Sequence, residues 1–148
     1  IEDELWEKRF KYNDIQELLI KKKNVDIRKE VFSGSLHGIE HAMIGIMPFH
    51  VMCDRWDIGG LSTNFHPSTG KPTVFIYDGF DGGIGLSEKG YELFGEIAKT
   101  TLELVKECSC EQGCPACVYS PKCGNDNKPM DKEGAIFLLD KIKSNVSF

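Results

Sequence analysis

The stretch Cys108-Ser-Cys110-Glu-Gln-Gly-Cys114-Pro-Ala-Cys117 decides how this chain is interpreted, because it gathers thiols closely enough to share one metal ion. Five of the six cysteines lie within the 16 residues from Cys108 to Cys123, and only Cys53 stands apart. A disulfide framework spreads its cysteines to close long loops, whereas a metal site gathers them. The pattern therefore predicts a zinc site, with an iron–sulfur site, disulfides or free thiols as the alternatives.

Five cysteines compete for the four ligand positions of a tetrahedral structural zinc. The turn Cys114-Pro-Ala-Cys117 is typical of a knuckle that brings two sulfurs onto one ion. Cys108 and Cys110 are expected to supply the other two, with Gly113 letting the chain turn around the metal. A competing set uses Cys123 together with Cys110 and the knuckle, and leaves Cys108 free.

The expected role of this metal is structural. A loop rich in Gly, Pro and Ser buries too little apolar surface to hold itself together, so a bound ion would crosslink it. A catalytic zinc keeps an open position and usually has His or carboxylate ligands. No such residue belongs to the cluster; Glu111 is adjacent, and an isolated Glu there is more often solvated.

Length and composition are typical of a single soluble domain. The chain has 148 residues, of which 41% are hydrophobic and 28% charged. No apolar run approaches the ~20 residues that span a bilayer, and the acidic start lacks the features of a signal peptide. Clustered thiols favour a reducing, cytoplasmic setting. Because no initiator Met is present, we interpret the chain as part of a longer protein.

The charge distribution does not favour DNA binding by this chain alone. The net charge is −5, and phosphate neutralisation needs clustered Lys and Arg. Residues 1–30 hold eight basic and eight acidic side chains, so the deficit belongs to the remainder. The basic run Lys21-Lys22-Lys23 is either a solvated helix end or a phosphate contact in a larger assembly.

Hydrophobic periodicity predicts an α+β domain, in which a small antiparallel sheet packs with several helices and a four-cysteine zinc loop lies between the last two helices. The expected helices span residues 4–22, 37–47, 87–106 and 131–143, with Asp131 as the cap of the last. The expected strands span residues 51–54, 58–65 and 73–77, the last two joined as a hairpin by a Pro- and Gly-rich turn at 66–72. We place a helical lead-in at residues 1–31 and a zinc-binding domain at residues 32–148.

Two further segments suggest chemistry without specifying it. The glycine-rich stretch 78–87 follows a strand, but it does not fit G-x-G-x-x-G, and Asp78 and Asp81 would repel phosphate, so a tight turn is favoured. Cys53-Asp-Arg-Trp-Asp57 sets carboxylates beside a thiol, which favours a core thiol with a surface ion pair over a Cys–His or carboxylate–His site.

Histidines supply one further metal-binding hypothesis. His37 and His41 stand four residues apart and could bind a metal on one helix face, although the metalloprotease pattern H-E-x-x-H is absent because the Glu stands at position 40. Buried or capping histidines are the default interpretation, as they are for His50 and His66.

Five motifs resemble a known family in the same order along the chain. They are Leu36-His-Gly-Ile-Glu-His-Ala42, Cys53-Asp-Arg-Trp-Asp-Ile-Gly-Gly60, His66-Pro-Ser-Thr-Gly-Lys-Pro72, Ile76-Tyr-Asp-Gly-Phe-Asp-Gly-Gly-Ile-Gly-Leu-Ser-Glu-Lys-Gly90 and the cysteine block through Ser120-Pro-Lys-Cys-Gly124. Over roughly residues 32 to 140 the chain resembles the C-terminal zinc-binding domain of mitomycin repair factor A and related superfamily-2 DNA helicases.

The resemblance implies a function that spacing alone does not. Such helicases hydrolyse ATP, bind and unwind DNA and serve in DNA repair, and this domain follows their two motor domains. The family's four metal-binding cysteines fall on Cys108, Cys110, Cys114 and Cys117 of this sequence, while Cys123 matches a cysteine present in part of the family. Phe80-Asp81 departs from the family pattern, in which a Pro often follows, and this makes the loop more acidic.

The chain carries no Walker A motif, no acidic helicase box and no arginine-rich helicase motif, so it is not expected to hydrolyse ATP or unwind DNA alone. We interpret it as an accessory domain that packs on motor domains in cis and shapes the DNA path, with no membrane partner. One rival is a small hydrolase or nuclease that holds a divalent ion with four carboxylates, namely Asp54, Asp57, Asp78 and Asp81. Another is a protein–protein docking module.

Overall fold

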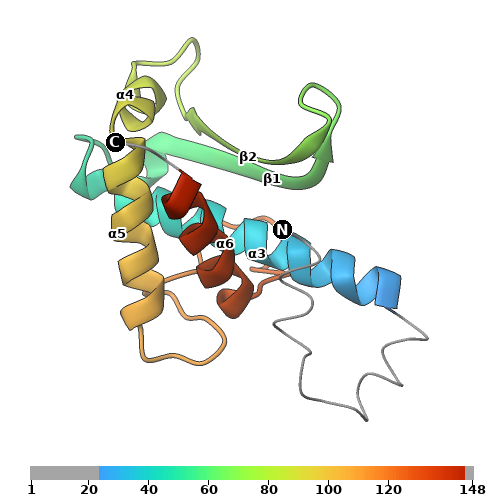
Figure 1. The fold of residues 1–148 in the computed structure, drawn as a ribbon. Coiled ribbons are helices and arrows are strands. Elements are labelled where there is room, and N and C mark those ends of the chain that lie inside the picture. The colour runs from blue at the N-terminus through green and yellow to red at the C-terminus, as the bar shows by residue number, and fades with distance from the viewer. Residues whose placement is uncertain (1–23, 146–148) are drawn as a thin grey trace.

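A computed structural model of the chain describes residues 24–145 and confirms the predicted α+β class (Figure 1). One hairpin and four helices make up this part of the chain, together with two short 3-10 turns. In chain order the elements are α3 (Asn24–Ile46), η1 (Met47–Phe49), η2 (Arg55–Asp57), β1 (Ile58–His66), β2 (Lys71–Asp78), α4 (Leu86–Glu92), α5 (Phe94–Glu107) and α6 (Lys132–Asn145). None of these helices is long and apolar enough to cross a membrane.

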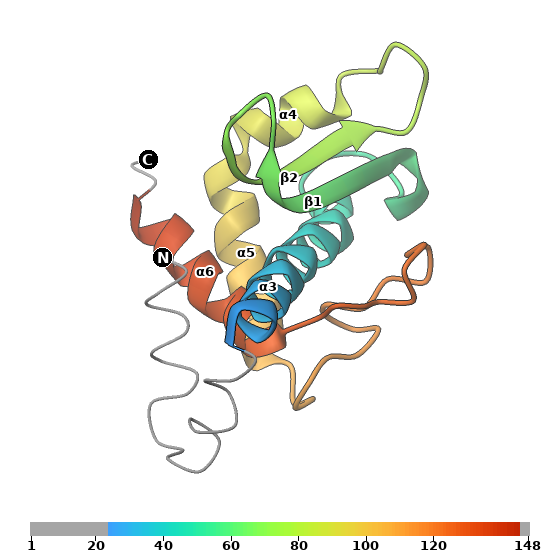
Figure 2. The same cartoon turned by 90° about the vertical axis from the view of Figure 1, so that its right-hand side faces the viewer.

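Helix α3 is the centre of the domain. The hairpin lies across one side of it, and α5 and α6 pack along the other (Figures 1 and 2). Nearly every side chain from Phe32 to Met47 is buried, because α3 is covered from several directions. Helix α3 is therefore a core helix.

Two glycines allow the close packing around α3. A Cβ atom on Gly34 would lie 2.9 Å from the backbone of Met130 and Asp131, so the chain entering α6 passes directly against the helix. A Cβ on Gly60 would lie 2.8 Å from Glu40 Cγ, so β1 rests on the opposite side of α3 with no space for a side chain. Larger residues at either position would push these elements apart.

The predicted hairpin is confirmed, with β1 and β2 antiparallel and Ile58 paired with Asp78. The register shifts between Thr63 and His66, just before the turn. The strand predicted for residues 51–54 is wrong, because Val51 and Met52 form a bend and Cys53 and Asp54 lead irregularly into η2. There Asp54 accepts a hydrogen bond from the Trp56 amide and the Asp57 carboxylate accepts one from the Asp54 amide, which closes the chain into a turn.

Two helix boundaries differ from the prediction. Helix α3 begins at Asn24 rather than at residue 37 and runs unbroken across residues 31 and 32, while the domain boundary drawn there stays a prediction. The single helix expected over residues 87–106 is broken at Leu93, because Gly90 and Gly95 flank that position and lower the helix propensity on both sides. The helix predicted for residues 4–22 lies outside the described residues.

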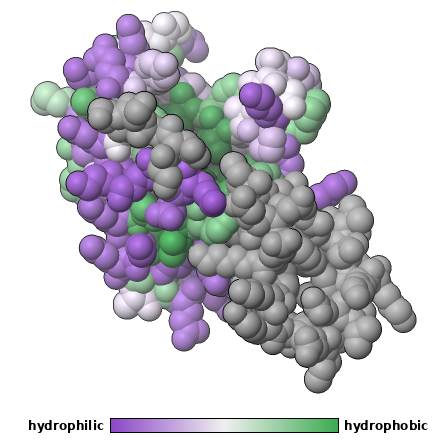
Figure 3. All heavy atoms as spheres, in the orientation of Figure 1, coloured by the Kyte–Doolittle hydropathy of each residue, from purple (hydrophilic) through white to green (hydrophobic). Residues whose placement is uncertain are grey.

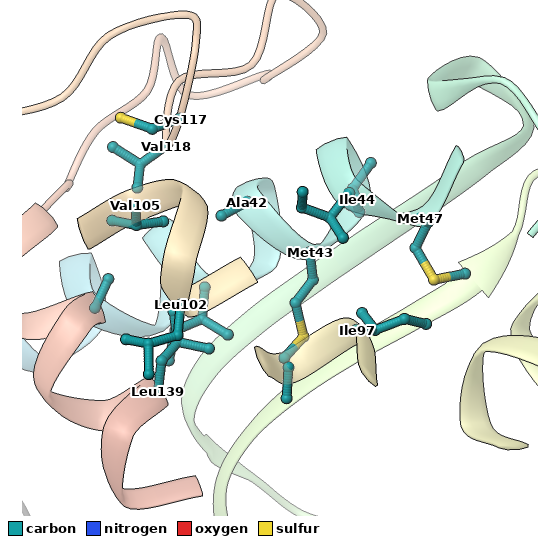
Figure 4. Close-up of a cluster of buried hydrophobic side chains, with 14 of the residues drawn as sticks. Ala42, Met43, Ile44, Met47, Ile97, Leu102, Val105, Cys117, Val118 and Leu139 are labelled. Carbon is teal, nitrogen blue, oxygen red and sulfur yellow. The ribbon is translucent and has the colours of Figure 1, made fainter. Parts of the chain in front are cut away.

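The hydrophobic core joins α3, α5, α6 and the cysteine loop, which is the segment 108–131 between α5 and α6, into one cluster. Figure 4 shows Cys117 and Val118 of the loop beside Val105 of α5, with Leu102 and Leu139 further along the same layer. Val105, Val118 and Leu139 are fully buried. The cysteine loop is therefore part of the core packing and cannot shift without disturbing it.

Candidate metal centre

Four cysteine sulfurs meet between the end of α5 and the start of α6. The Sγ–Sγ separations are 3.6 Å for Cys108–Cys110, 3.4 Å for Cys108–Cys114, 3.5 Å for Cys110–Cys117 and 3.8 Å for Cys114–Cys117. A tetrahedral zinc with Zn–S bonds near 2.3 Å requires sulfurs about 3.8 Å apart. All four lie within 4.8 Å of one another and form no disulfide, so their donor set and spacing fit zinc.

Local backbone geometry sets each sulfur in place. Cys108 caps the C-terminus of α5, and its amide still donates to the Leu104 carbonyl. The Cys114 carbonyl accepts from the amides of both Cys117 and Tyr119, which folds the Cys-Pro-Ala-Cys turn tightly. Gly113 has φ of 132°, and a Cβ there would lie 2.7 Å from the Tyr119 ring, so glycine is required at this bend.

Lys132, at the start of α6, is a site residue that the sequence did not reveal. Its side chain is buried, and its ammonium group donates to the carbonyl oxygens of Cys108, at 2.8 Å, and of Cys110. It also lies 3.2 Å from Cys110 Sγ. Four thiolates around one Zn²⁺ carry a net charge of −2, and a buried ammonium group in contact with a sulfur offsets part of it.

The thiols of the cluster do not titrate alike. Burial would raise the pKa of Cys110, but the hydrogen bonds from Lys132 and the neighbouring thiols lower it to about 6. Burial raises the pKa of Cys117 to about 12, and the bond with Cys108 raises the pKa of Cys114. The first thiolate to form therefore opposes the ionisation of its neighbours, and a cation that binds all four removes that opposition.

Cys123 is not in this cluster. Its Sγ lies 3.5 Å from His37 Nε2 on α3, and the ring centroids of His37 and His41 are 4.1 Å apart. The Nδ1 atoms of His37 and His41 lie 2.8 Å from the carbonyl oxygens of Pro129 and Val118, respectively. Burial, followed by the charge of His37, lowers the pKa of His41 to about 4. His37 and His41 thus link α3 to the cysteine loop.

A polar cleft of about 340 Å³ opens beside these two histidines. Its lining includes Glu40, Ser62, Lys122 and Cys123. Burial raises the pKa of Glu40, against the hydrogen bond with Ser62, and burial lowers the pKa of Lys122. The Lys122 ammonium group donates to the carbonyl oxygens of Arg55, at 2.7 Å, and of Ile58.

The other candidate residues either form hydrogen bonds with the backbone or lie away from the four-cysteine cluster. Asp54 and Asp57 close η2, and the Asp78 carboxylate accepts from the amides of Ile84, Leu86 and Ser87 at 2.6–3.1 Å. Within residues 24–145, no group of three or more potential metal ligands contains these carboxylates or Asp81. His50 bonds to Thr100, His66 accepts from the Ser68 amide, and Cys53 is a partly buried thiol against the core. Lys21, Lys22 and Lys23 lie outside the described residues.

Replacing Asp78 with asparagine is expected to lower the thermal unfolding midpoint by a few degrees at neutral pH. The three amide donors lower the pKa of this carboxyl group, so folding favours its charged form. Its contribution is present above the unfolded-state pKa of about 4 and is lost as the pH falls towards the lower folded-state value. The difference between wild type and variant, measured by thermal unfolding across pH 7 to pH 3, should therefore shrink below pH 4.

Asp81→Asn is the matched control, because it removes the same charge from an exposed position only three residues away. Acid also releases zinc from thiolates, but it does so in wild type and variants alike, and the difference between them cancels this effect. An Asp78→Asn protein as stable as the Asp81→Asn protein at pH 7 would contradict the assigned role of Asp78.

Comparison with known proteins assigns the chain to a family. The family model for the MrfA Zn-binding domain, MZB, matches residues 39–118, which is more than half of the chain. The chain belongs to the MZB family. The resemblance derived from sequence motifs is confirmed, and so is structural zinc as its cofactor. The choice of Cys108, Cys110, Cys114 and Cys117 as ligands stays a prediction.

Relatives of this MZB domain differ greatly in length. MJ1572.1, an uncharacterized protein of Methanocaldococcus jannaschii, is 43% identical over 112 residues and is matched along its whole length. The uncharacterized ATP-dependent helicase YprA of Bacillus subtilis is 38% identical over 125 residues, which are 84% of this chain and 16% of YprA. ATP-dependent helicase HRQ1 of Saccharomyces cerevisiae is 28% identical over 120 residues, 11% of its length.

A solved structure also matches the fold. The DUF1998 helicase MrfA, crystallised with DNA, superposes with a TM-score of 0.65 at 34% identity, over 77% of this chain and 15% of the helicase. A second crystal structure, with DNA and AMPPNP, gives a TM-score of 0.59. The chain spans about one sixth or less of these helicases, whereas it spans all of MJ1572.1.

Proposed function

We propose that this MZB domain is a zinc-stabilised accessory domain of an ATP-dependent DNA helicase, which packs on the motor domains and helps shape the DNA path. The observation that carries this proposal is the match, at 34% identity, to a segment of DNA-bound MrfA. The parent protein would then supply ATP hydrolysis, DNA binding and a role in DNA repair. We propose a cytoplasmic setting, in keeping with six cysteines that form no disulfide.

The surface supports packing against other protein. Three large apolar side chains on the segment from η1 to η2, which we call the loop patch, are strongly exposed: Phe49 at 81%, Met52 at 101% and Trp56 at 64%. A separate apolar groove of about 410 Å³, lined by residues that include Ile39, Met43 and Phe94, lies between the hairpin and α5. Figure 3 shows apolar surface in this region. Exposed apolar surface of this kind marks interaction sites in soluble proteins.

A chimeric helicase tests the proposal. The matching segment of YprA would be deleted in one protein and replaced by this chain in another, and ATP-driven unwinding of duplex DNA would be measured. We expect the deletion to abolish unwinding and the chimera to restore it. Unwinding that is unaffected by the deletion would overturn the accessory role.

The loop patch is tested in the same chimera. Replacing Phe49 and Met52 together with glutamate should reduce unwinding at least 10-fold, about the effect of losing 1.4 kcal/mol of docking energy, without changing zinc content or melting temperature. Lys99→Glu is the control, since Lys99 is exposed on α5. Equal loss in both variants would show that added negative charge, and not loss of apolar contact, is responsible.

The nuclease alternative is weakened because the carboxylates of Asp54, Asp57 and Asp78 already accept hydrogen bonds from backbone amides. It is tested by incubating the chain with DNA and Mg²⁺ or Mn²⁺. Cleavage that Asp78→Ala abolishes would support the nuclease, and we expect none. The docking-module alternative is tested with separate proteins. This chain is added to YprA that lacks the matching segment, and co-elution of the two is measured.

A further inference from the structure

A second group of metal-ligating side chains lies outside the four-cysteine cluster. His37 and His41 from α3 and Cys123 from the loop bring one potential ligand atom each to within 4.8 Å of one another. The fold joins residues 86 positions apart in this group, and both histidines are buried. We propose that these three residues bind a second divalent metal ion, Zn²⁺ or a similar borderline cation, separate from the four-cysteine zinc.

The hydrogen bonds of the two imidazoles prepare them for a metal. A carbonyl oxygen only accepts hydrogen bonds, so Nδ1 of His37 must donate to Pro129 and Nδ1 of His41 to Val118. Each neutral ring then carries its lone pair on Nε2, the other nitrogen. Ligating histidines in metalloproteins are commonly fixed by such a bond from the second nitrogen to a carbonyl or carboxylate, which sets tautomer and ring orientation.

The distance between His37 and Cys123 fits a tetrahedral ion. With Zn–N bonds of about 2.0–2.1 Å and a Zn–S bond of about 2.3 Å, nitrogen and sulfur ligands lie about 3.6 Å apart. His37 Nε2 and Cys123 Sγ lie 3.5 Å apart. The two histidines stand four residues apart on one face of α3, and the spacing His37-x-x-Glu40-His41 is the H-x-x-E-H arrangement that holds zinc in one class of metalloproteases.

The loop that carries Cys123 is held in place independently. The Ser120 amide donates to Asn127 Oδ1 at 2.7 Å, and Asn127 Nδ2 donates back to the Ser120 carbonyl at 3.1 Å. These two bonds close the loop around Cys123, so its thiol faces the histidines in a defined position. A preformed ligand set costs less entropy on metal binding than one assembled from a flexible loop.

This second site differs chemically from the four-cysteine cluster because it has three protein ligands. Its members line the 340 Å³ polar cleft, which leaves a fourth position for water or a small oxygen ligand. The mixed imidazole and thiolate donor set favours zinc, cobalt or nickel over magnesium or calcium, which prefer oxygen. The proposal concerns metal binding by these residues and does not depend on the helicase role.

Metal content and ligand identity together test the proposal. The chain is saturated with zinc, freed of excess by gel filtration, and its zinc is measured per chain by mass spectrometry. X-ray absorption at the zinc edge then reports sulfur and imidazole ligands separately. The wild type is expected to hold about two ions, with imidazole scattering in the spectrum, because the two sites use different donors.

Two variants remove the second site with little change in shape. Cys123→Ser replaces the thiol by a similar hydroxyl, and His37→Asn retains an N–H donor for the Pro129 carbonyl while removing Nε2. Each is expected to hold about one ion with a sulfur-only spectrum, at an unchanged circular dichroism spectrum. Cys53→Ser, which alters a cysteine outside both clusters, should keep about two.

A wild-type protein with one zinc, a sulfur-only spectrum and the same content in Cys123→Ser would overturn the second site. So would rapid alkylation of Cys123 that added zinc or cobalt does not slow, since Cys123 and His37 would then form a hydrogen-bonded thiol–imidazole pair and not part of a metal site. Zinc that protects Cys123 from alkylation in the wild type but not in His37→Asn would support it.

Discussion

Replacement of Cys114 by serine is expected to remove the zinc of the four-cysteine cluster and to unfold at least the loop between α5 and α6. Structural zinc contributes about 10–16 kcal/mol in zinc-finger peptides, as much as the whole stability of an ordinary domain, about 5–15 kcal/mol. Cys117 and Val118 belong to the core, so disorder in the loop should spread to α6. We expect the thermal midpoint to fall by on the order of 10 °C or more.

The same measurement separates the two possible ligand sets. Cys108→Ser should lose one zinc per chain and melt early, like Cys114→Ser, because Cys108 Sγ lies 3.4 Å from Cys114 Sγ. Cys123→Ser should retain the four-cysteine zinc, and Cys53→Ser should match the wild type. Zinc analysis and thermal melts that show full metal content and unchanged stability in Cys114→Ser would contradict the structural zinc site.

Replacement of Lys132 by methionine is expected to weaken zinc binding by about 10- to 100-fold, the usual effect of losing a residue that supports metal ligands. Methionine has a similar length and fills the buried position, but it leaves the carbonyl oxygens of Cys108 and Cys110 without this donor. It also removes the positive charge beside Cys110 Sγ. Competition with a chromophoric chelator measures the affinity.

Lys106→Met is the matched control for this effect. It removes the same charge from the last turn of α5, close to the cluster along the chain, but from an exposed side chain. We expect less than a 3-fold change there, because exposed charges interact weakly through water. Equal weakening in both variants would mean that net charge alone governs the affinity and that the buried contacts of Lys132 add nothing.

The four-cysteine cluster was predictable because its members lie within ten consecutive residues, 108–117, and local spacing brings them together. The hairpin was predictable for the same reason, since its turn residues stand between two β-prone runs. Lys132 was not, because no pattern around it signals a contact with cysteines 22 to 24 residues away. The meeting of Cys123 with His37 depends on how α3 crosses the loop, which spacing does not encode.

The helix errors have equally specific causes. The second helix was expected to start at residue 37, whereas α3 begins at Asn24. Gly34 lies inside α3 although glycine has a low helix propensity, because the close approach of the chain entering α6 leaves no space for a side chain there. The apolar spacing of Leu93, Phe94 and Ile97 hid the break between α4 and α5, although Gly90 and Gly95 were a signal of it.

The position of α3 at the centre has a consequence for the order in which this domain is made. On the ribosome α3 emerges before the hairpin, α5, the cysteine loop and α6, all of which cover it in the finished fold. Its apolar surface therefore stays exposed in the nascent chain until the segments that cover it have been synthesised. The last of them is the cysteine loop with α6, so we expect this surface to close only when the zinc site can form.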